Sequence, residues 1–199
     1  MNTQEDQAVL RLRHQIEQFV PLTDEDWALL QPHLTMTTLK KHGLFVRAGT
    51  VATEVALVLD GMLRQFYPKD GEERTTYFFF ENHFLSAYIS CLTGKPAQIT
   101  IEALTETTYI SFPYARLSDL FDQRMVWQKF GRLIAEYLAI GLEERMVNLL
   151  LLTPEERYLD LMMSGRKKIL ERVPQHYIAS YLGITPVSLS RIRNRILRK

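Results

Sequence analysis

The sequence of 199 residues contains a single cysteine, Cys91. One thiol can neither close a disulfide within the chain nor supply a zinc or iron–sulfur site made of cysteines. No stretch approaches the roughly 20 apolar residues that a membrane helix needs. The N-terminal residues lack a cationic segment followed by an apolar block, so no signal peptide is expected. These absences predict a cytoplasmic protein without membrane contact.

The chain also has almost no net charge, but its charges are unevenly distributed. The formal net charge is +1, yet residues 165–199 carry nine Lys and Arg against one acid, Glu171, which puts them at +8 and the remainder at −7. A basic end on an acidic body is typical of a module that binds a polyanion. A solvated arginine-rich helix would have the same charge, so charge alone leaves both interpretations open.

Residues 36–112 have the pattern of an all-β domain. Short runs of β-branched and aromatic residues alternate with glycines at intervals of about 8–12 residues. Within them the segment 68–71, Pro-Lys-Asp-Gly, suits a hairpin turn. Two helices are predicted before this region, and the second begins at Thr23, whose hydroxyl can cap free backbone N–H groups.

From Tyr114 onward the periodicity is helical. One apolar seam with spacings of three and four residues is the predicted dimer interface: Trp127, Phe130, Ile134, Tyr137 and Gly141. A second apolar strip consists of Leu120, Leu133, Leu138 and Leu142. A helix with two apolar faces packs against two partners, which we expect to be its own β domain and a second copy of the chain. Burial of the whole helix within one chain is the alternative.

The next helix has a clear start signal. Thr153 is a good N-cap, Pro154 suits the first helical position, and Glu156 completes a capping box. The helix is expected to end at Ser164-Gly165, so a domain boundary is predicted near residue 150.

Residues 173–199 carry the spacing of a helix-turn-helix. With Gln175 counted as the first position, Ala179 is the fifth, Gly183 the ninth and Leu189 the fifteenth. The fifth residue is small because the second helix crosses over it, and the ninth adopts positive φ in a tight turn. The outward face of the second helix carries donors suited to bases and phosphates in a major groove: Ser188, Arg191, Asn194 and Arg195. A three-helix packing motif with solvated arginines is the alternative.

Taken in order, these features resemble the Crp/Fnr family of transcription regulators. The resemblance covers nearly the full length and rests on the segments 41–44 (Lys-His-Gly-Leu), 48–49 (Ala-Gly), 59–64 (Leu-Asp-Gly-Met-Leu-Arg), Phe84, the long helix, 178–185 and 188–191 (Ser-Leu-Ser-Arg). It implies an α+β fold with a double-stranded β-helix (jelly-roll) sensor domain of the cyclic-nucleotide-binding type. The implied divisions are a sensor domain at 1–113, a central dimerisation helix at 114–150 and a helix-turn-helix domain at 151–199.

The resemblance also implies a function and its residues. The protein would be a homodimeric regulator rather than an enzyme, binding a palindromic operator in double-stranded DNA, with RNA polymerase as a further candidate partner. The implied DNA-binding residues are Gln175, Thr185, Ser188, Ser190, Arg191, Asn194 and Arg195. Because the sequence stops at Lys199, little or no C-terminal wing is expected, and Arg198 and Lys199 would contact phosphates instead.

The sequence departs from the family at the cyclic nucleotide anchors. Members that bind cyclic AMP have a Gly-Glu pair where this chain has Ser86-Ala87, and an Arg followed by a small hydroxyl residue where it has Ala97-Gln98. With Tyr88, these residues form the candidate effector pocket. Since burying a phosphate without a cationic partner is costly, cyclic AMP is not the expected effector, and no cofactor is predicted. Lys95 or Arg74 would have to replace the missing cation.

Other sensing chemistries and functions fit less well. A lone Cys91 does not hold an iron–sulfur centre and is expected to be a small buried hydrophobe. A cupin-like enzyme needs clustered metal ligands, whereas the β region offers His42 and His83 without a His-x-His pair. A hydrophobic effector, or none, remains open. The second hypothesis is an interaction module that acts through protein partners and has a vestigial DNA-binding domain.

Overall fold

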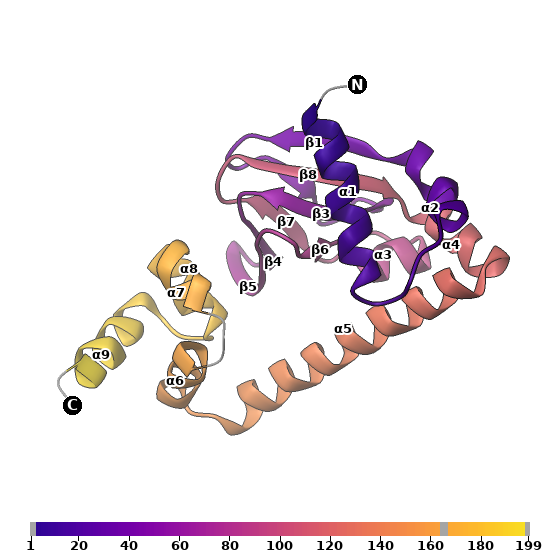
Figure 1. Ribbon diagram of the computed structural model, residues 1–199. Helices are drawn as coiled ribbons and strands as arrows, with labels where there is room; N and C mark the ends of the chain where they lie inside the picture. Colours follow the sequence, from indigo (N-terminus) through magenta and orange to yellow (C-terminus); the bar gives the residue numbers. More distant parts are fainter. Residues whose placement is uncertain (1–2, 164–166, 198–199) are drawn as a thin grey trace. The chain divides into compact units, whose positions relative to one another are not determined.

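The computed structural model describes residues 3–163 and 167–197 (Figure 1). The helices are α1 (Thr3–Glu17), α2 (Asp24–Leu30), the 3-10 helix η1 (Gln31–His33), α3 (Tyr88–Thr93), α4 (Tyr114–Gln123), α5 (Met125–Leu151), α6 (Pro154–Met163), α7 (Lys167–Arg172), α8 (Gln175–Tyr181) and α9 (Pro186–Leu197). The strands are β1 (Thr35–Leu39), β2 (Leu44–Val46), β3 (Glu54–Asp60), β4 (Leu63–Lys69), β5 (Glu72–Phe79), β6 (Phe84–Leu85), β7 (Thr100–Ala103) and β8 (Thr107–Pro113). No helix within these described ranges is both long and apolar enough to cross a membrane.

The strands form two four-stranded sheets, as the β pattern of 36–112 predicts. Their orders are β1-β8-β3-β6 and β2-β7-β4-β5, a jelly-roll arrangement in which consecutive strands lie in different sheets except for the β4–β5 hairpin. The pairings of β1 and β3 with β8 are antiparallel. The predicted hairpin turn over 68–71 is present, but it consists only of the last two of these residues. Pro68 belongs to β4, and Asp70 and Gly71 make the turn with φ of 53° and 79°, the positive values that a two-residue hairpin loop requires.

The contacts divide the chain into two compact units. The first consists of residues 1–65 and 78–137, and the second of residues 66–77 and 138–199. This division differs from the predicted boundaries near 113 and 150, because α5 spans both units and the tip of the β4–β5 hairpin groups with the C-terminal helices. The predicted helix end at Ser164-Gly165 lies outside the described residues.

Two apolar clusters stabilise the first unit. One joins helices α1, α2 and α4 and the start of α5 to the outer face of β3 and β8, and α1 lies across this sheet in Figure 1. The other fills the space between the two sheets. In the first cluster Phe130 makes edge-to-face contacts with Phe19 and Phe84, at centroid distances of 5.8 and 5.9 Å. The first turns of α5 are therefore part of the core of this unit.

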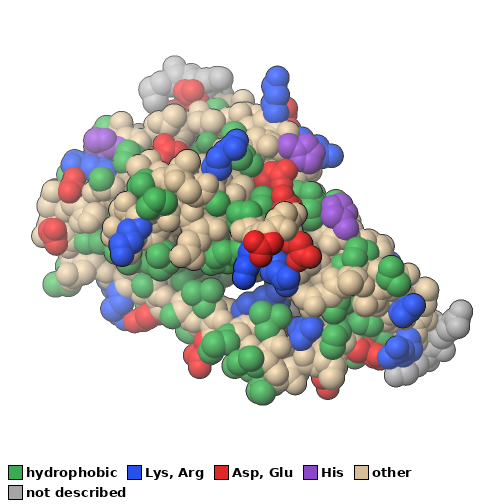
Figure 2. Space-filling model, turned by 180° about the vertical axis from the view of Figure 1, so that it is seen from behind, with side chains coloured by type: hydrophobic (Ala, Val, Ile, Leu, Met, Phe, Trp, Pro, Cys, Tyr) green, Lys and Arg blue, Asp and Glu red, His purple; other side chains and the backbone are tan. Residues whose placement is uncertain are grey.

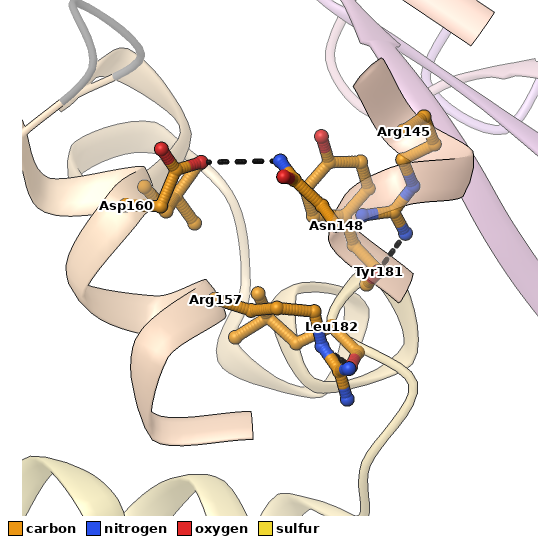
Figure 3. A pocket seen from close by; sticks show the side chains of 7 residues that line it. Arg145, Asn148, Arg157, Asp160, Tyr181 and Leu182 are labelled. Carbon is orange, nitrogen blue, oxygen red and sulfur yellow. Dashed lines mark hydrogen bonds between the residues drawn. The ribbon is translucent and has the colours of Figure 1, made fainter. Parts of the chain in front are cut away.

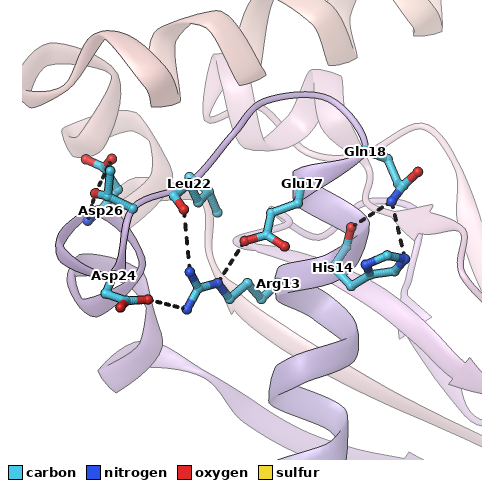
Figure 4. Close-up of polar contacts among 8 residues, drawn as sticks. Arg13, His14, Glu17, Gln18, Leu22, Asp24 and Asp26 are labelled. Atoms are coloured by element: carbon cyan, nitrogen blue, oxygen red, sulfur yellow. Dashed lines mark hydrogen bonds and ion pairs between the residues drawn. The ribbon is translucent and has the colours of Figure 1, made fainter.

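Polar contacts fix the N-terminal helices in the same unit (Figure 4). Arg13 on α1 donates to Glu17 one turn later at 2.9 Å and pairs with Asp24 at 2.8 Å. Thr23 caps α2 as the sequence predicts, since its hydroxyl accepts from the Asp26 amide. These contacts join α1 to the start of α2.

Candidate nucleic-acid interface

The pair α8 and α9 is built on a small buried core. Ala179 is 0% exposed, and Leu189 and Ile192 are buried on the inner face of α9. The small side chain of Ala179 lets the second helix approach α8 closely, as the spacing predicts. Ile178, Leu182 and the α7 residue Ile169 are also buried. The inner face of α9 is thus fully used in folding, and only its outer face is left for a partner.

The turn between α8 and α9 sets the angle of the second helix. Gly183 has φ of 70°, the left-handed conformation predicted for this position. The Gly183 amide donates to Ser180 O at 3.0 Å and the Ile184 amide to Ala179 O at 3.0 Å. This bond pattern is a Schellman motif, which satisfies the last carbonyl groups of α8 and ends the helix sharply.

The start of α9 is fixed by two hydroxyl groups. The Ser188 amide donates to Thr185 Oγ1 at 3.2 Å, and the two side-chain oxygens lie 3.0 Å apart. Thr185 is therefore the N-cap, and Pro186 follows at the first helical position, where its missing N–H costs nothing. The hydroxyl of half-buried Ser188 is already engaged in this cap.

Four exposed side chains share the outer face of α9. Ser190, Arg191 and Asn194 are three of the predicted DNA-binding residues, and Val187 precedes them at the same helical spacing. Gln175 is also exposed, at the start of α8. Sequence reasoning missed Val187 because an apolar residue is expected inside. The signal that identifies it is its spacing of four residues from Arg191.

Arg195 differs from its neighbours on the predicted face. Its guanidinium pairs with Glu155 of α6 at 2.6 Å. The pair holds α9 against α6, and contact of Arg195 with DNA would require the arginine to leave Glu155. Arg198 and Lys199, predicted to contact phosphates, lie outside the described residues.

Two arginines join the end of α5 to the turn after α8 (Figure 3). Arg157 of α6 donates to Leu152 O at 2.7 Å and to Leu182 O at 3.1 Å, so it bridges the C-terminal ends of two helices. Arg145 of α5 donates to Tyr181 O and lies over the Tyr181 ring, 3.9 Å from its centroid. Cations at helix C-termini interact favourably with the helix dipole. The contacts made by the two arginines that line this pocket therefore have a structural role, because they orient the α8–α9 pair.

Ser180 of α8 contacts the tip of the β4–β5 hairpin. Ser180 Oγ accepts from the Thr75 amide at 3.0 Å and donates to Glu73 O at 2.9 Å. Both hairpin partners are backbone atoms, so Ser180 satisfies two polar groups of the hairpin at once.

The predicted effector residues lie in an apolar and largely closed environment. Ala87 and Ala97 are buried in the cluster between the sheets, where Phe79 and Tyr109 also pack. Tyr88 contacts the Tyr114 ring edge-to-face at 6.1 Å, and Gln98 is exposed. The two cations that could replace the missing anchor, Lys95 and Arg74, are exposed, and Arg74 pairs with Glu72 at 2.9 Å.

Cys91 is close to this region and is half-buried. Ser86 Oγ lies 3.3 Å from Cys91 Sγ and donates to Glu54 O. Burial raises the pKa of the Cys91 thiol, against a smaller lowering by Ser86. A raised pKa keeps the thiol protonated and is the opposite of what a reactive cysteine shows.

The structure corrects part of the predicted dimer interface. Trp127 and Phe130 are 0% and 3% exposed in the core of the first unit, and Ile134 packs against the same cluster. These side chains are unavailable to a partner because their own chain covers them. Tyr137 and Gly141 are exposed.

Exposed apolar residues lie farther along α5 and belong partly to the second predicted strip. One row of them recurs at helical spacing and consists of Leu138, Leu142, Met146 and Leu149. Figure 2 shows hydrophobic side chains at the surface along this helix. The apolar stripe of α5, defined as Leu138, Leu142, Met146 and Leu149, is therefore left uncovered by its own chain.

The β region contains the two histidines that were considered as metal ligands, His42 and His83. In the part of the chain that the structure describes, no group of three or more His, Cys, Asp and Glu side chains is arranged to hold a metal ion. His42 instead pairs with Glu102 at 2.6 Å, and the same carboxylate accepts from buried Arg64 at 3.1 Å.

Comparison with known proteins gives the same architecture. Residues 36–124 match the family model of the cyclic nucleotide-binding domain. A search of curated proteins finds no match. Among solved structures, the chain is similar to FixK2 from Bradyrhizobium japonicum, with 18% identity, TM-score 0.70, and coverage of 83% of this chain and 85% of that one. A transcriptional regulator of the Crp/Fnr family from Eubacterium rectale gives 17% identity, TM-score 0.71, and coverage of 88% and 84%. The catabolite activator protein of Thermus thermophilus gives 19% identity and a TM-score of 0.56, with coverage of 90% of this chain and 86% of that one. At these identities the likeness shows the fold.

Proposed function

We propose that this chain, whose residues 36–124 match the family model of the cyclic nucleotide-binding domain and which has the fold of Crp/Fnr regulators, is a sequence-specific DNA-binding transcription regulator acting as a homodimer. The observation that carries the proposal is the outer face of α9. It presents Ser190, Arg191 and Asn194 to solvent on a helix that a buried core, a Schellman turn and a threonine cap hold in place. Such a helix-turn-helix has the donors that base edges require.

The residue types on α9 suit a major groove. Arg191 can donate two hydrogen bonds to guanine, and Asn194 can pair with the edge of adenine. Residues 165–199 carry a net charge of +8, which favours approach to the phosphate backbone and makes binding salt-dependent. Gln175, at the exposed start of α8, is the proposed phosphate contact of the first helix. We assign no catalytic residue.

The apolar stripe of α5 supports a homodimer. An exposed leucine and methionine row at helical spacing is costly in water and is buried when two copies pack along it. Two-fold symmetry would place the two α9 helices for successive major grooves of a palindromic operator, about 34 Å apart.

The sensor domain is proposed not to bind cyclic AMP in the usual way. Ala87 and Ala97 bring no charge to the cyclic phosphate and ribose, and both are packed in an apolar cluster. The effector is a different small molecule or is absent. Any effector would act by favouring one arrangement of the two α9 helices over another.

Selection of DNA fragments by the full chain, with and without cyclic AMP, tests the proposal. A palindromic motif enriched equally in both conditions is the expected result. A motif enriched only with cyclic AMP would contradict the interpretation of Ala87 and Ala97. Enrichment of no DNA, even at low salt, would contradict the regulator proposal and favour an interaction module acting through protein partners.

A further inference from the structure

Among the side chains of α9 that the structure describes, the apolar side chain of Val187 lies on the outer face and is not required for folding. Val187 is 61% exposed in the first turn of the helix, two residues after the Thr185 cap. A β-branched residue at an exposed helical position adds no packing and has a helix propensity below that of alanine. The stability of the fold therefore does not explain a valine at this position. A contact of the side chain with a binding partner would explain it.

The position of Val187 is well defined. The Thr185–Ser188 hydroxyl pair fixes the first turn of α9, and buried Leu189 fixes the rotation of the helix about its axis. Val187 then lies on the same face as Arg191, one turn closer to the N-terminus. In helices that enter a major groove, the N-terminal residues are those that reach base edges.

The chemistry of valine selects one base. Thymine is the base that presents a methyl group in the major groove, and apolar side chains contact it there. A valine against the edge of guanine, cytosine or adenine would cover hydrogen-bonding atoms without satisfying them, which is unfavourable.

We propose, building on the DNA-binding function proposed above, that Val187 is a specificity-determining residue that selects an A·T pair in each half-site by packing against the thymine methyl group. Arg191 and Asn194 would read neighbouring pairs through hydrogen bonds, while Val187 reads its pair by apolar contact alone.

Replacement of thymine by deoxyuridine tests this contact because it removes only the methyl group. In the duplex obtained by selection, each thymine is replaced in turn and the affinity of the full chain is measured. At one symmetric position we expect wild-type protein to lose affinity about fourfold per half-site, the factor for one buried methyl group, and about 15-fold when both half-sites are changed. On the thymine duplex, Val187→Ala should bind more weakly than the wild type by about the same factor. Its affinity should not change when that thymine is replaced by uracil.

Controls separate this contact from folding and from DNA binding in general. Val187→Ala should fold, since alanine is the better helix former. Met163→Ala, which removes an 83% exposed apolar side chain from α6, should keep the full uracil sensitivity of the wild type. If uracil at every thymine position leaves the wild-type affinity unchanged, the role of Val187 is overturned and the DNA-binding function stays intact. The same conclusion follows if the Val187→Ala protein remains sensitive to uracil. Failure of the wild type to bind any selected duplex overturns the function itself.

Discussion

Arg191 is the cation at the centre of the exposed face of α9. Its replacement by alanine should weaken operator binding by about 1–3 kcal/mol and relax the preference at one base pair in each half-site, because a bidentate contact to guanine is lost. Titration of operator variants by electrophoretic mobility shift measures both effects. Arg47→Ala, which removes the same charge from an exposed turn of the β domain, serves as the control and should leave sequence preference unchanged. Unchanged affinity and preference in Arg191→Ala would contradict the assignment.

Cys91 offers a second prediction for a single residue. Burial holds the pKa of its thiol above the ordinary value of 9.0, so little thiolate exists near neutral pH. We expect iodoacetamide to modify the native chain several times more slowly than the urea-unfolded chain at pH 8, with the native rate still rising beyond pH 9. Because the chain has one cysteine, the adduct measured by mass spectrometry reports on this site alone. Equal modification rates in the two states would show that the thiol is accessible in the folded chain and that its pKa is not raised.

The capping box of α6 makes stability depend on pH. The Thr153 amide and hydroxyl both donate to Glu156 Oε2 at 2.7 Å, and these bonds lower the pKa of Glu156 below its ordinary 4.5. For a carboxylate with a lowered folded-state pKa, the stabilisation is present above the unfolded pKa and is lost as pH falls through the folded value. Glu156→Gln should therefore reduce stability at pH 7, and this effect should become smaller as the pH falls below the ordinary pKa of 4.5.

Urea denaturation of both proteins at pH 7 and pH 3 measures this difference. Thr153→Ala is the companion variant, because it removes the N-cap hydroxyl and should cost about 1 kcal/mol at neutral pH. Glu155→Gln changes the neighbouring carboxyl, which pairs with Arg195 instead of capping the helix, and serves as the matched charge control. A Glu156→Gln effect that is the same at pH 3 and pH 7 would exclude a role for the ionised carboxylate.

How far the sequence predicts an element depends on the range of the interactions that determine it. The α8–α9 turn was predictable because its determinants, from Ala179 to Leu189, lie within eleven residues and leave few choices of residue type. The Thr23 and Thr153 caps are equally local, and both are confirmed. The turn spacing predicted only an all-β domain, and the jelly roll was predicted from the family resemblance, because strand order depends on contacts between residues far apart in sequence.

The orientation of α5 could not be predicted in the same way. Its two apolar strips look alike in sequence, and members of both are buried at the N-terminal end and exposed farther along. Where burial stops is decided by residues far away in sequence, such as Phe19 and Phe84, which contact Phe130. Val187 was missed for a related reason. Whether an apolar helical residue lies inside or outside depends on helix rotation, which Leu189 and Ile192 decide only once the core exists.

At the scale of the whole molecule, the apolar stripe of α5 determines the proposed assembly. Leu142 is 70% exposed near its middle, and a glutamate there would bury a charge in any interface along the stripe. We expect Leu142→Glu to convert a dimer into a monomer in sedimentation velocity experiments and to weaken operator binding, because the second half-site contact is lost. Leu10→Glu changes a similarly exposed leucine on α1 and should leave the dimer intact. A Leu142→Glu protein that remains dimeric would place the interface elsewhere.

The contact of Ser180 with the hairpin bears on how the C-terminal unit could be exchanged between proteins of this fold. A chimera made by grafting residues 138–199 onto another sensor would leave its hairpin tip to the recipient. Because Ser180 bonds the carbonyl of Glu73 and the amide of Thr75, the graft could keep this contact with other side chains at those two positions. It would not tolerate a hairpin of different length, which carries those two backbone groups out of reach. For the Ser180 contact, the length of the hairpin therefore matters more than its sequence.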